Sequence, residues 1–264
     1  MRSLILAATT SLICLAAPAL AAPAAPGSAP GASVASPLYT PRQISAEDAT
    51  RDVALLRRAL ETVHPGLYRY TPKAQIDAAF ARLEAAASRP ITELALHAEI
   101  ARMLATIHCD HSKAEMPDTL SAFRRTNATH LPLRFRLIEG RMIVQSNDGQ
   151  PGAPPRGSEI LEINGMPVPQ LLLQLSAMVS YDGATDHAIA AKLGDDSDLA
   201  GDDFNEFYPS LFGFPASWTI QWKPVGALQP QTVVLDPIAF VDWTALAGPG
   251  AKYRGDFYNS NTWR

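Results

Sequence analysis

The stretch that decides the fold of this chain is Gly157-Ser158-Glu159-Ile160-Leu161-Glu162-Ile163-Asn164-Gly165-Met166-Pro167-Val168. Its aliphatic residues, Ile160, Leu161 and Ile163, favour a short strand. Asn164-Gly165 is a dipeptide typical of tight hairpin turns, because both residues tolerate a positive φ. An apolar run at 170–175 follows and suits a helix. The sequence therefore predicts a strand, a tight turn and a helix in this region.

The same stretch resembles the G-x-x-I-x-x-I-N-G core of a PDZ-like domain, a fold that often holds peptide C-termini. An ordinary strand-turn-helix unit is the alternative explanation of the pattern. The resemblance implies that the residues around this stretch complete a domain of that kind.

The bulk composition is that of a globular protein. Of the 264 residues, 47% are hydrophobic and 18% are charged, which is enough apolar material for a buried core. The formal net charge of −4 gives no basic surface for nucleic acid, so none is expected as a partner.

The N-terminus predicts an exported protein. Arg2, an apolar run at 4–17 and the A-x-A pattern at 19–21 are typical of a signal peptide spanning 1–21. The apolar run is too short for a membrane span, and no later segment is long enough. We expect a periplasmic or extracellular protein in which Cys109 remains as the only cysteine, so that no disulfide forms within the chain. Residues 22–42, rich in Ala, Pro and Gly, are predicted to be a flexible linker.

Helical periodicity predicts a helical domain at 43–128. Three amphipathic helices are expected at 45–63, 72–88 and 92–107, with Ser45, Thr71 and Thr92 as N-caps. The short links between them favour a small antiparallel bundle. Residues 113–130 are predicted to be a loop.

The second half predicts a PDZ-like domain at 129–240. A β-hairpin is expected at 131–145, short helices at 185–193 and 198–208, and paired strands at 217–222 and 231–235. Residues 241–264 are predicted to be an incomplete tail. The expected fold class is α+β: an N-terminal helical bundle followed by a PDZ-like β domain with inserted helices.

Several short motifs, taken in order, resemble the N-terminal and PDZ-like region of the tail-specific protease family, also called C-terminal processing peptidases. They are His64-Pro65-Gly66-Leu67-Tyr68, Cys109-Asp110-His111-Ser112, Tyr181-Asp182-Gly183 and the aromatic run at 207–214. Asp110 stands where the family usually has glycine. The tight backbone turn that this glycine would allow is therefore not transferred to this chain. We transfer no catalytic role to His111.

The resemblance implies a serine peptidase that acts by a Ser/Lys mechanism in a separate, later domain. No S-x-x-K or G-x-S-x-G motif occurs in this chain, so no catalytic residue is assigned to it. A Ser-His-Asp triad from scattered residues is an alternative without local support; its candidates are His64, Ser112, Asp118 and His130.

Two functions therefore stand side by side. In the first, the chain is the N-terminal portion of an exported serine-type peptidase that cleaves polypeptides or peptide tails. In the second, it is a catalytically inactive, PDZ-like peptide-binding or scaffold module. The sequence does not predict the oligomeric state.

Peptide contacts are predicted at four apolar side chains of the PDZ-like region, with core packing as the alternative: Leu133, Phe135, Leu172 and Leu175.

Metal is not expected. The residues 108–112 hold His, Cys and Asp at a spacing that is poor for ligands, and a helix end, where His and Asp bind loose backbone groups, is the better explanation. The acidic residues at 195–203 lack the spacing of a calcium loop. No cofactor is predicted.

Overall fold

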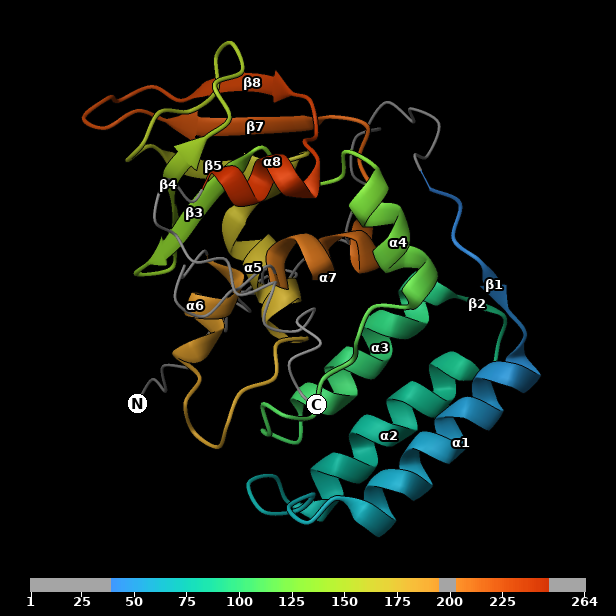
Figure 1. The fold of residues 1–264 in the computed structure, drawn as a ribbon. Coiled ribbons are helices and arrows are strands. Elements are labelled where there is room, and N and C mark those ends of the chain that lie inside the picture. The colour runs from blue at the N-terminus through green and yellow to red at the C-terminus, as the bar shows by residue number, and fades with distance from the viewer. Residues whose placement is uncertain (1–38, 195–202, 247–264) are drawn as a thin grey trace, which may run out of the picture. The chain divides into compact units, whose positions relative to one another are not determined.

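The computed structural model describes residues 39–194 and 203–246 (Figure 1). The predicted signal peptide, most of the predicted linker, the acidic stretch at 195–202 and the end of the predicted tail lie outside the described residues. Helices and antiparallel strands are both present in the described part, so the fold class is α+β.

Three N-terminal helices lie side by side: α1 (Ala46–Val63), α2 (Lys73–Ala87) and α3 (Glu93–Ala105) (Figure 1). The predicted N-caps at Ser45 and Thr92 are confirmed, since their hydroxyl oxygens accept from the backbone N–H groups of Asp48 and Ala95. Just before α1 and α3, the short strands β1 (Gln43–Ile44) and β2 (Ile91–Thr92) pair with each other.

The remaining N-cap prediction, Thr71, is wrong. Pro72, not Thr71, occupies the N-cap position of α2. The Thr71 hydroxyl instead donates a 2.7 Å hydrogen bond to the carbonyl of Thr106, at the end of α3. The Thr71 hydroxyl therefore bonds to a distant carbonyl and does not provide the cap of α2 that the local pattern predicted.

α3 is buried on more than one side because it serves two hydrophobic clusters. Leu96, Met103 and Leu104 pack with α1 and α2, whereas Ala98 and Ala101 belong to the cluster under the sheet. The predicted boundary at residue 128 stays a prediction, but α3 ties the helices before it to the residues after it.

The predicted loop at 113–130 contains a helix, α4 (Asp118–Thr126). Leu120 is fully buried there, in a small cluster with Met116 and Phe214. Tyr39 joins this cluster through ring contacts with Phe123 and Phe214, so ordered structure begins before Ser45, inside the predicted linker. Pattern reasoning missed α4 because its apolar stripe is short and its partners come from distant parts of the chain.

The main sheet has the order β3-β4-β5-β7-β8, and every pair is antiparallel. β3 (Leu133–Ile138) and β4 (Arg141–Asn147) form the predicted hairpin, and β7 (Trp218–Lys223) and β8 (Gln231–Leu235) form the second predicted pair. Both strand predictions are confirmed.

The stretch at 157–168 forms the predicted strand, turn and helix. β5 (Glu159–Ile163) turns into β6 (Met166–Pro167) through Asn164 (φ 50°) and Gly165 (φ 81°), and α5 (Val168–Ser176) follows. Asn164 also exchanges two 2.8 Å hydrogen bonds with Thr219 of β7. The turn therefore sets the register of the neighbouring strand as well as its own.

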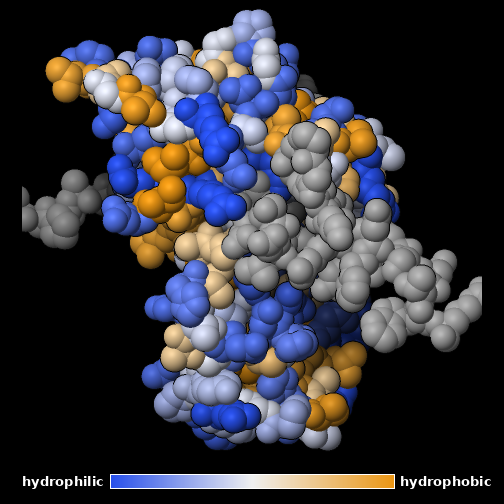
Figure 2. Space-filling model, turned by 60° about the vertical axis from the view of Figure 1, so that its left-hand side comes forward, coloured by the Kyte–Doolittle hydropathy of each residue, from blue (hydrophilic) through white to orange (hydrophobic). Residues whose placement is uncertain are grey.

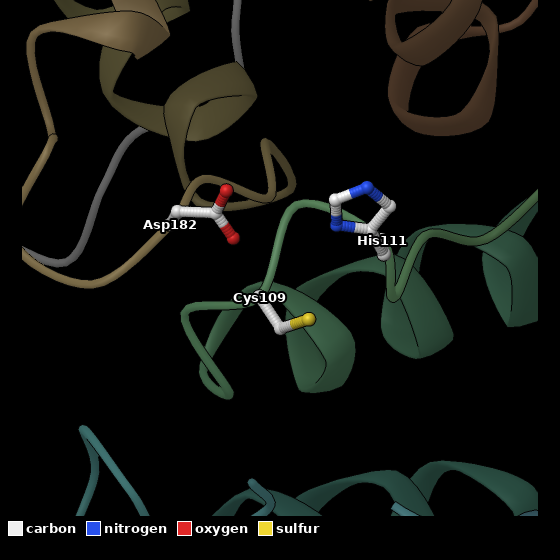
Figure 3. A group of neighbouring side chains, drawn as sticks. All are labelled: Cys109, His111 and Asp182. Carbon is white, nitrogen blue, oxygen red and sulfur yellow. The ribbon is translucent and has the colours of Figure 1, made fainter.

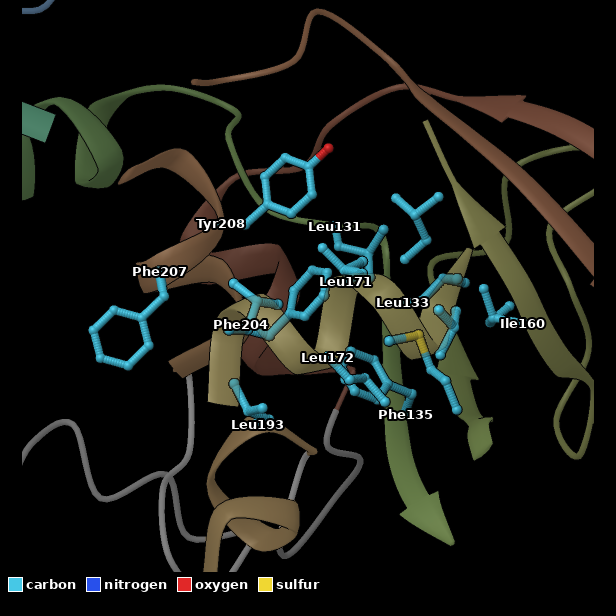
Figure 4. Packing of buried hydrophobic residues seen from close by; sticks show 14 of the residues in the cluster. Leu131, Leu133, Phe135, Ile160, Leu171, Leu172, Leu193, Phe204, Phe207 and Tyr208 are labelled. Carbon is cyan, nitrogen blue, oxygen red and sulfur yellow. The ribbon is translucent and has the colours of Figure 1, made fainter. Parts of the chain in front are cut away.

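The main core lies between the sheet and the helices α5, α6 (Ala188–Leu193) and α7 (Asp203–Phe212). Figure 4 shows side chains of β3, β5, α5 and α7 converging there. Trp218, only 1% exposed, packs against Phe204 and Tyr208 of α7, with ring centroids 6.4 and 4.8 Å away. These contacts join the sheet to the inserted helices.

Part of the predicted tail is helical. α8 (Phe240–Ala245) begins at its boundary and places Trp243 over Arg134 of β3, 4.5 Å from the ring centroid to the guanidinium carbon. The Trp243 indole N–H donates to the carbonyl of Leu133 at 3.3 Å. The first residues of the predicted tail therefore belong to the folded part, because they cover β3.

Hydrophobic residues on the face drawn in Figure 2 lie in several separate groups among hydrophilic ones. The most exposed large hydrophobic side chains, Leu228, Val225 and Val63, come from a loop of the sheet and from the end of α1. Among the described helices, none has both the length and the apolar character that crossing a bilayer demands.

A buried histidine joins α3 to α7. His97 is 4% exposed; its Nε2–H donates to the Ala114 carbonyl at 3.2 Å, so its Nδ1 accepts from the Ser210 hydroxyl at 2.8 Å. Burial lowers the pKa of His97 below its usual 6.5. The imidazole is therefore neutral in the fold over a pH range in which the unfolded chain already takes up a proton.

We expect acid to destabilise the protein through His97. Because the folded pKa is depressed, stability falls as pH drops below about 6.5, with a limiting slope of about 1.4 kcal/mol per pH unit. His97→Gln removes this component, and His187→Gln, at an exposed position, keeps it. Urea unfolding of the three proteins from pH 8 to pH 5 measures the difference. Parallel pH profiles for the unmutated protein and His97→Gln would contradict the prediction.

Candidate functional site

Segments far apart in the sequence meet at one place, which we call the motif junction. It consists of His64, the loop at 108–112 after α3, the segment at 180–183 after α5, and Lys192 of α6. These segments contain parts of three of the four motifs that carry the resemblance to tail-specific proteases, those at 64–68, 109–112 and 181–183; the aromatic run at 207–214 lies elsewhere, mostly on α7. The structure therefore brings together residues that the sequence only places in order.

The first arm of the junction is the end of α1. His64 caps the helix, and its Nδ1 accepts from the Gly66 backbone N–H at 3.1 Å. In the neutral imidazole the proton is then on Nε2, which donates to the Ser112 hydroxyl oxygen at 3.0 Å. With this tautomer, His64 orients Ser112 but does not accept its proton.

The second arm is the loop after α3. The chain reverses at His108, whose φ is 58°, and the Ser112 N–H donates to the Cys109 carbonyl at 3.0 Å. The left-handed residue is thus His108 and not Asp110. A glycine is therefore not needed at position 110 for this turn, and the substitution that departs from the family pattern creates no backbone strain.

The third arm is fastened to the second by backbone hydrogen bonds. The Gly183 N–H donates to the His108 carbonyl at 2.9 Å, and the Asp110 N–H donates to Oδ1 of Asp182 at 2.8 Å. The Tyr181 hydroxyl lies 3.1 Å from Nε2 of His108, and the two rings are 4.6 Å apart. These contacts join residues 72 to 75 positions apart in the sequence and fix the two loops against each other.

A half-buried ion pair lies beneath these loops. The ammonium of Lys192 binds the carboxylate of Asp110 and donates to the Ser180 carbonyl at 2.7 Å. Burial alone would raise the pKa of Asp110, but the hydrogen bond from Lys192 and the positive charge of Lys113 outweigh it and lower this pKa. Asp110 is therefore held as a carboxylate, and Lys192 joins α6 to the junction.

Loss of Lys192 should loosen the junction. The Lys192 side chain is 15% exposed and Lys113 is 48% exposed, although both pair with Asp110. We expect Lys192→Met to lower the free energy of unfolding by about 1–2 kcal/mol, and Lys113→Met by less than about 0.5 kcal/mol.

Denaturant unfolding at pH 7 measures both variants. Because the folded pKa of Asp110 is lowered, its contribution is present above the unfolded value of about 3.9 and is lost as pH falls through the folded pKa. The difference between the unmutated chain and Lys192→Met should shrink accordingly in acid. Equal losses for the two lysine variants would refute a special role for Lys192.

One face of the junction gathers three groups that can ligate a metal. The Cys109 thiol, the His111 imidazole and the Asp182 carboxylate each offer an atom, and these atoms all lie within 4.8 Å of one another. Figure 3 shows the three side chains facing a shared space between the two loops. No metal site was predicted from the sequence, because the spacing within residues 108–112 provides no third ligand. Asp182, the third group, comes from a segment far along the chain.

The candidates for a scattered triad are only partly brought together. His64 and Ser112 are in contact, but the hydrogen bond runs from the imidazole to the hydroxyl. His130 is fully buried, with Nε2 accepting from Arg124 at 3.1 Å and with the rings of α8 beside it. Asp118 lies in the first turn of α4. These neighbours do not support a triad of the four residues.

The predicted peptide-contacting side chains are core residues. Leu133, Phe135, Leu172 and Leu175 are all buried in the main cluster beneath the sheet. Their contact with peptide stays a prediction, and their burial favours the alternative role in packing.

The outer edge of β3 is covered as well. The Trp243 indole binds the carbonyl of Leu133, and the end of α6 at Gly194 lies against the backbone of Arg136 and Leu137. The sheet path ends on the other side at β8, where Gln231, Thr232 and Val234 are exposed. Within the described residues, β8 is therefore the better candidate edge for strand addition.

An open cavity of about 580 Å³ adjoins the junction, with His108 and Tyr181 in its wall. Its charged lining is already paired: Glu99 binds Arg102 and lies 3.7 Å from Arg82. Two guanidinium groups share this one carboxylate, so the cavity wall keeps a net positive charge.

Sequence reasoning missed Ser180 and Lys192 as parts of the site, and it placed Asp182 only in a helix-ending motif. The order of the family motifs was the one available signal, because it placed 181–183 in the same series as 64–68 and 109–112. Lys192 carries no local signal, since its importance rests on its contact with Asp110.

Comparison with known proteins finds solved structures of similar fold but assigns the chain to no family. No family model matches the chain, and no curated protein matches it. Solved structures that resemble it include mature CPAF, with 12% identity, a TM-score of 0.43, and coverage of 78% of this chain and 38% of that chain. A serine-to-alanine variant of CPAF gives 14% identity, a TM-score of 0.42, and coverage of 73% and 34%.

Mature CPAF complexed with lactacystin gives 14% identity, a TM-score of 0.43, and coverage of 80% of this chain and 39% of that chain. The chain thus spans less than two fifths of the length of these CPAF structures. Similarity at this level does not assign a function.

Proposed function

We propose that the chain is the N-terminal portion of an exported serine-type peptidase that resembles the tail-specific proteases. The intact protein hydrolyses peptide bonds in polypeptides or peptide tails by a Ser/Lys mechanism, with its serine and lysine supplied by residues outside this sequence. In this proposal the described residues bind and position the polypeptide substrate, and the later residues perform the hydrolysis.

The meeting of three of the four motifs at the motif junction carries this proposal. The resemblance rested on their order along the chain, without any assumption about contact. Hydrogen bonds nevertheless join His64 to Ser112 and Asp110 to Asp182, at separations of 48 and 72 positions. Motifs that contact one another are less apt to occur together by chance than motifs that lie apart. Their contact therefore strengthens a resemblance that rests on several motifs of moderate specificity.

Peptide recognition is the task that the proposal gives to the sheet. An extended chain adds to a sheet by forming backbone hydrogen bonds along an unpaired edge. β8 is the edge strand left in the described part, since β3 is covered by α8 and by the end of α6. We therefore assign substrate docking to β8 and not to the buried side chains around Leu133.

The test uses the native protein from its own cells. An antibody against residues 45–240 should detect a band near twice the 28.4 kDa of this chain, and the purified band should hydrolyse an unfolded polypeptide. A serine-directed covalent inhibitor should abolish the hydrolysis. The isolated chain of 264 residues, purified in parallel, serves as the control and should show no hydrolysis.

A band slightly below 28.4 kDa without hydrolysis would overturn the proposal and favour the exported peptide-binding or scaffold module. Export is tested on the same material. Cell fractionation should place the protein in the periplasm or the medium, and N-terminal sequencing should begin at Ala22. A cytoplasmic protein that retains residues 1–21 would contradict the export part of the proposal.

A further inference from the structure

We propose that Cys109, His111 and Asp182 bind one Zn²⁺ ion, which closes the motif junction from the outside. The site is independent of the proposed peptidase function. Its three donors come from two loops, the one after α3 and the one after α5, so a bound ion would cross-link them.

The mutual distances suit a metal better than a catalytic relay. In a nucleophile-base-acid triad the imidazole stands between the other two groups, and the outer pair is far apart. Here all three donor atoms lie within 4.8 Å of one another, as a triangle around a shared space (Figure 3). A tetrahedral zinc site with the usual bond lengths needs donor separations of about 3.4–3.6 Å. Small side-chain rotations can close the remaining distance.

The donors are supported from behind, as metal ligands usually are. The Asp110 N–H donates to Oδ1 of Asp182, which orients the carboxylate, and Thr185 donates to the Asp182 carbonyl. The turn closed by the Ser112 N–H and the Cys109 carbonyl holds Cys109 and His111 within one loop. The backbone framework of the site therefore exists before any ion arrives.

The chemistry of the donors selects the ion. A thiolate and an imidazole favour zinc over magnesium or calcium, which prefer oxygen ligands. Cys109 is a free, half-buried thiol, whereas His111 and Asp182 are exposed, so an ion can enter from solvent. Three protein ligands leave a fourth position for water.

The test is a zinc titration of the full chain under reducing conditions, followed by calorimetry. We expect one Zn²⁺ per chain. Cys109→Ser, His111→Gln and Asp182→Asn should each weaken binding by at least the roughly 10–100-fold that loss of an outer-shell partner costs. His187→Gln and Asp186→Asn are matched controls at exposed positions outside the cluster, and their affinity should equal that of the unmutated chain.

A second measurement decides the matter if a variant fails to fold. Co²⁺ bound to the unmutated chain should show the charge-transfer absorption of a thiolate ligand, and excess Zn²⁺ should remove it. Absence of zinc binding, equal affinity in the ligand variants and controls, or a cobalt spectrum without the thiolate band would each overturn the site.

Discussion

Leu175→Ala should lower the free energy of unfolding by about 2–5 kcal/mol, the loss expected for a leucine removed from a closed core. Leu175 is fully buried on α5, where it faces the sheet in the cluster that contains Leu133 and Phe135. Truncation leaves a cavity and removes contacts on every side. Denaturant unfolding followed by circular dichroism measures the loss.

Leu173→Ala is the matched control, because Leu173 lies on the same helix and is 75% exposed. Its effect should stay within about 0.5 kcal/mol. The comparison also tests the prediction that Leu175 contacts peptide. A Leu175→Ala protein that keeps full stability but loses peptide binding would show that the side chain lines a groove and does not pack in the core.

Phe80→Ala should have a similar or larger effect, about 3–5 kcal/mol, at the other hydrophobic cluster. Phe80 is fully buried on α2, and the guanidinium of Arg57 lies 5.0 Å from its ring centroid. The substitution removes both the buried ring and this cation–π contact. Leu55→Ala on α1, where Leu55 is 55% exposed, is the control and should change stability little.

Phe80→Ala also tests whether the two clusters unfold together. α3 contributes to both, and all four tryptophans occur at position 218 or later, so fluorescence reports on the sheet side and circular dichroism on the helices. We expect coincident transitions by the two probes. A fluorescence transition unchanged by Phe80→Ala would mean that the helical part is an independent domain, as the predicted boundary at residue 128 implies.

The sequence by itself determined the local elements with strong signals. The Asn164-Gly165 turn, the strand before it and the N-caps at Ser45 and Thr92 are as predicted, because each depends on residues within a few positions. The α+β class followed from the succession of these elements. α4 and α8 escaped prediction, since each is short and owes its stability to partners distant in the sequence.

Only the tertiary structure decided which side chains are buried and which meet. Alternation placed Leu133 and Phe135 on one face of a strand, but it could not say whether that face met a peptide or α5 and α7. Spacing likewise gave no metal site among residues 108–112. Asp182 reaches Cys109 and His111 only because the two loops are bonded together by Asp110 and Gly183. Local pattern fixes backbone conformation, whereas a site built from distant segments depends on packing energies that no short stretch contains.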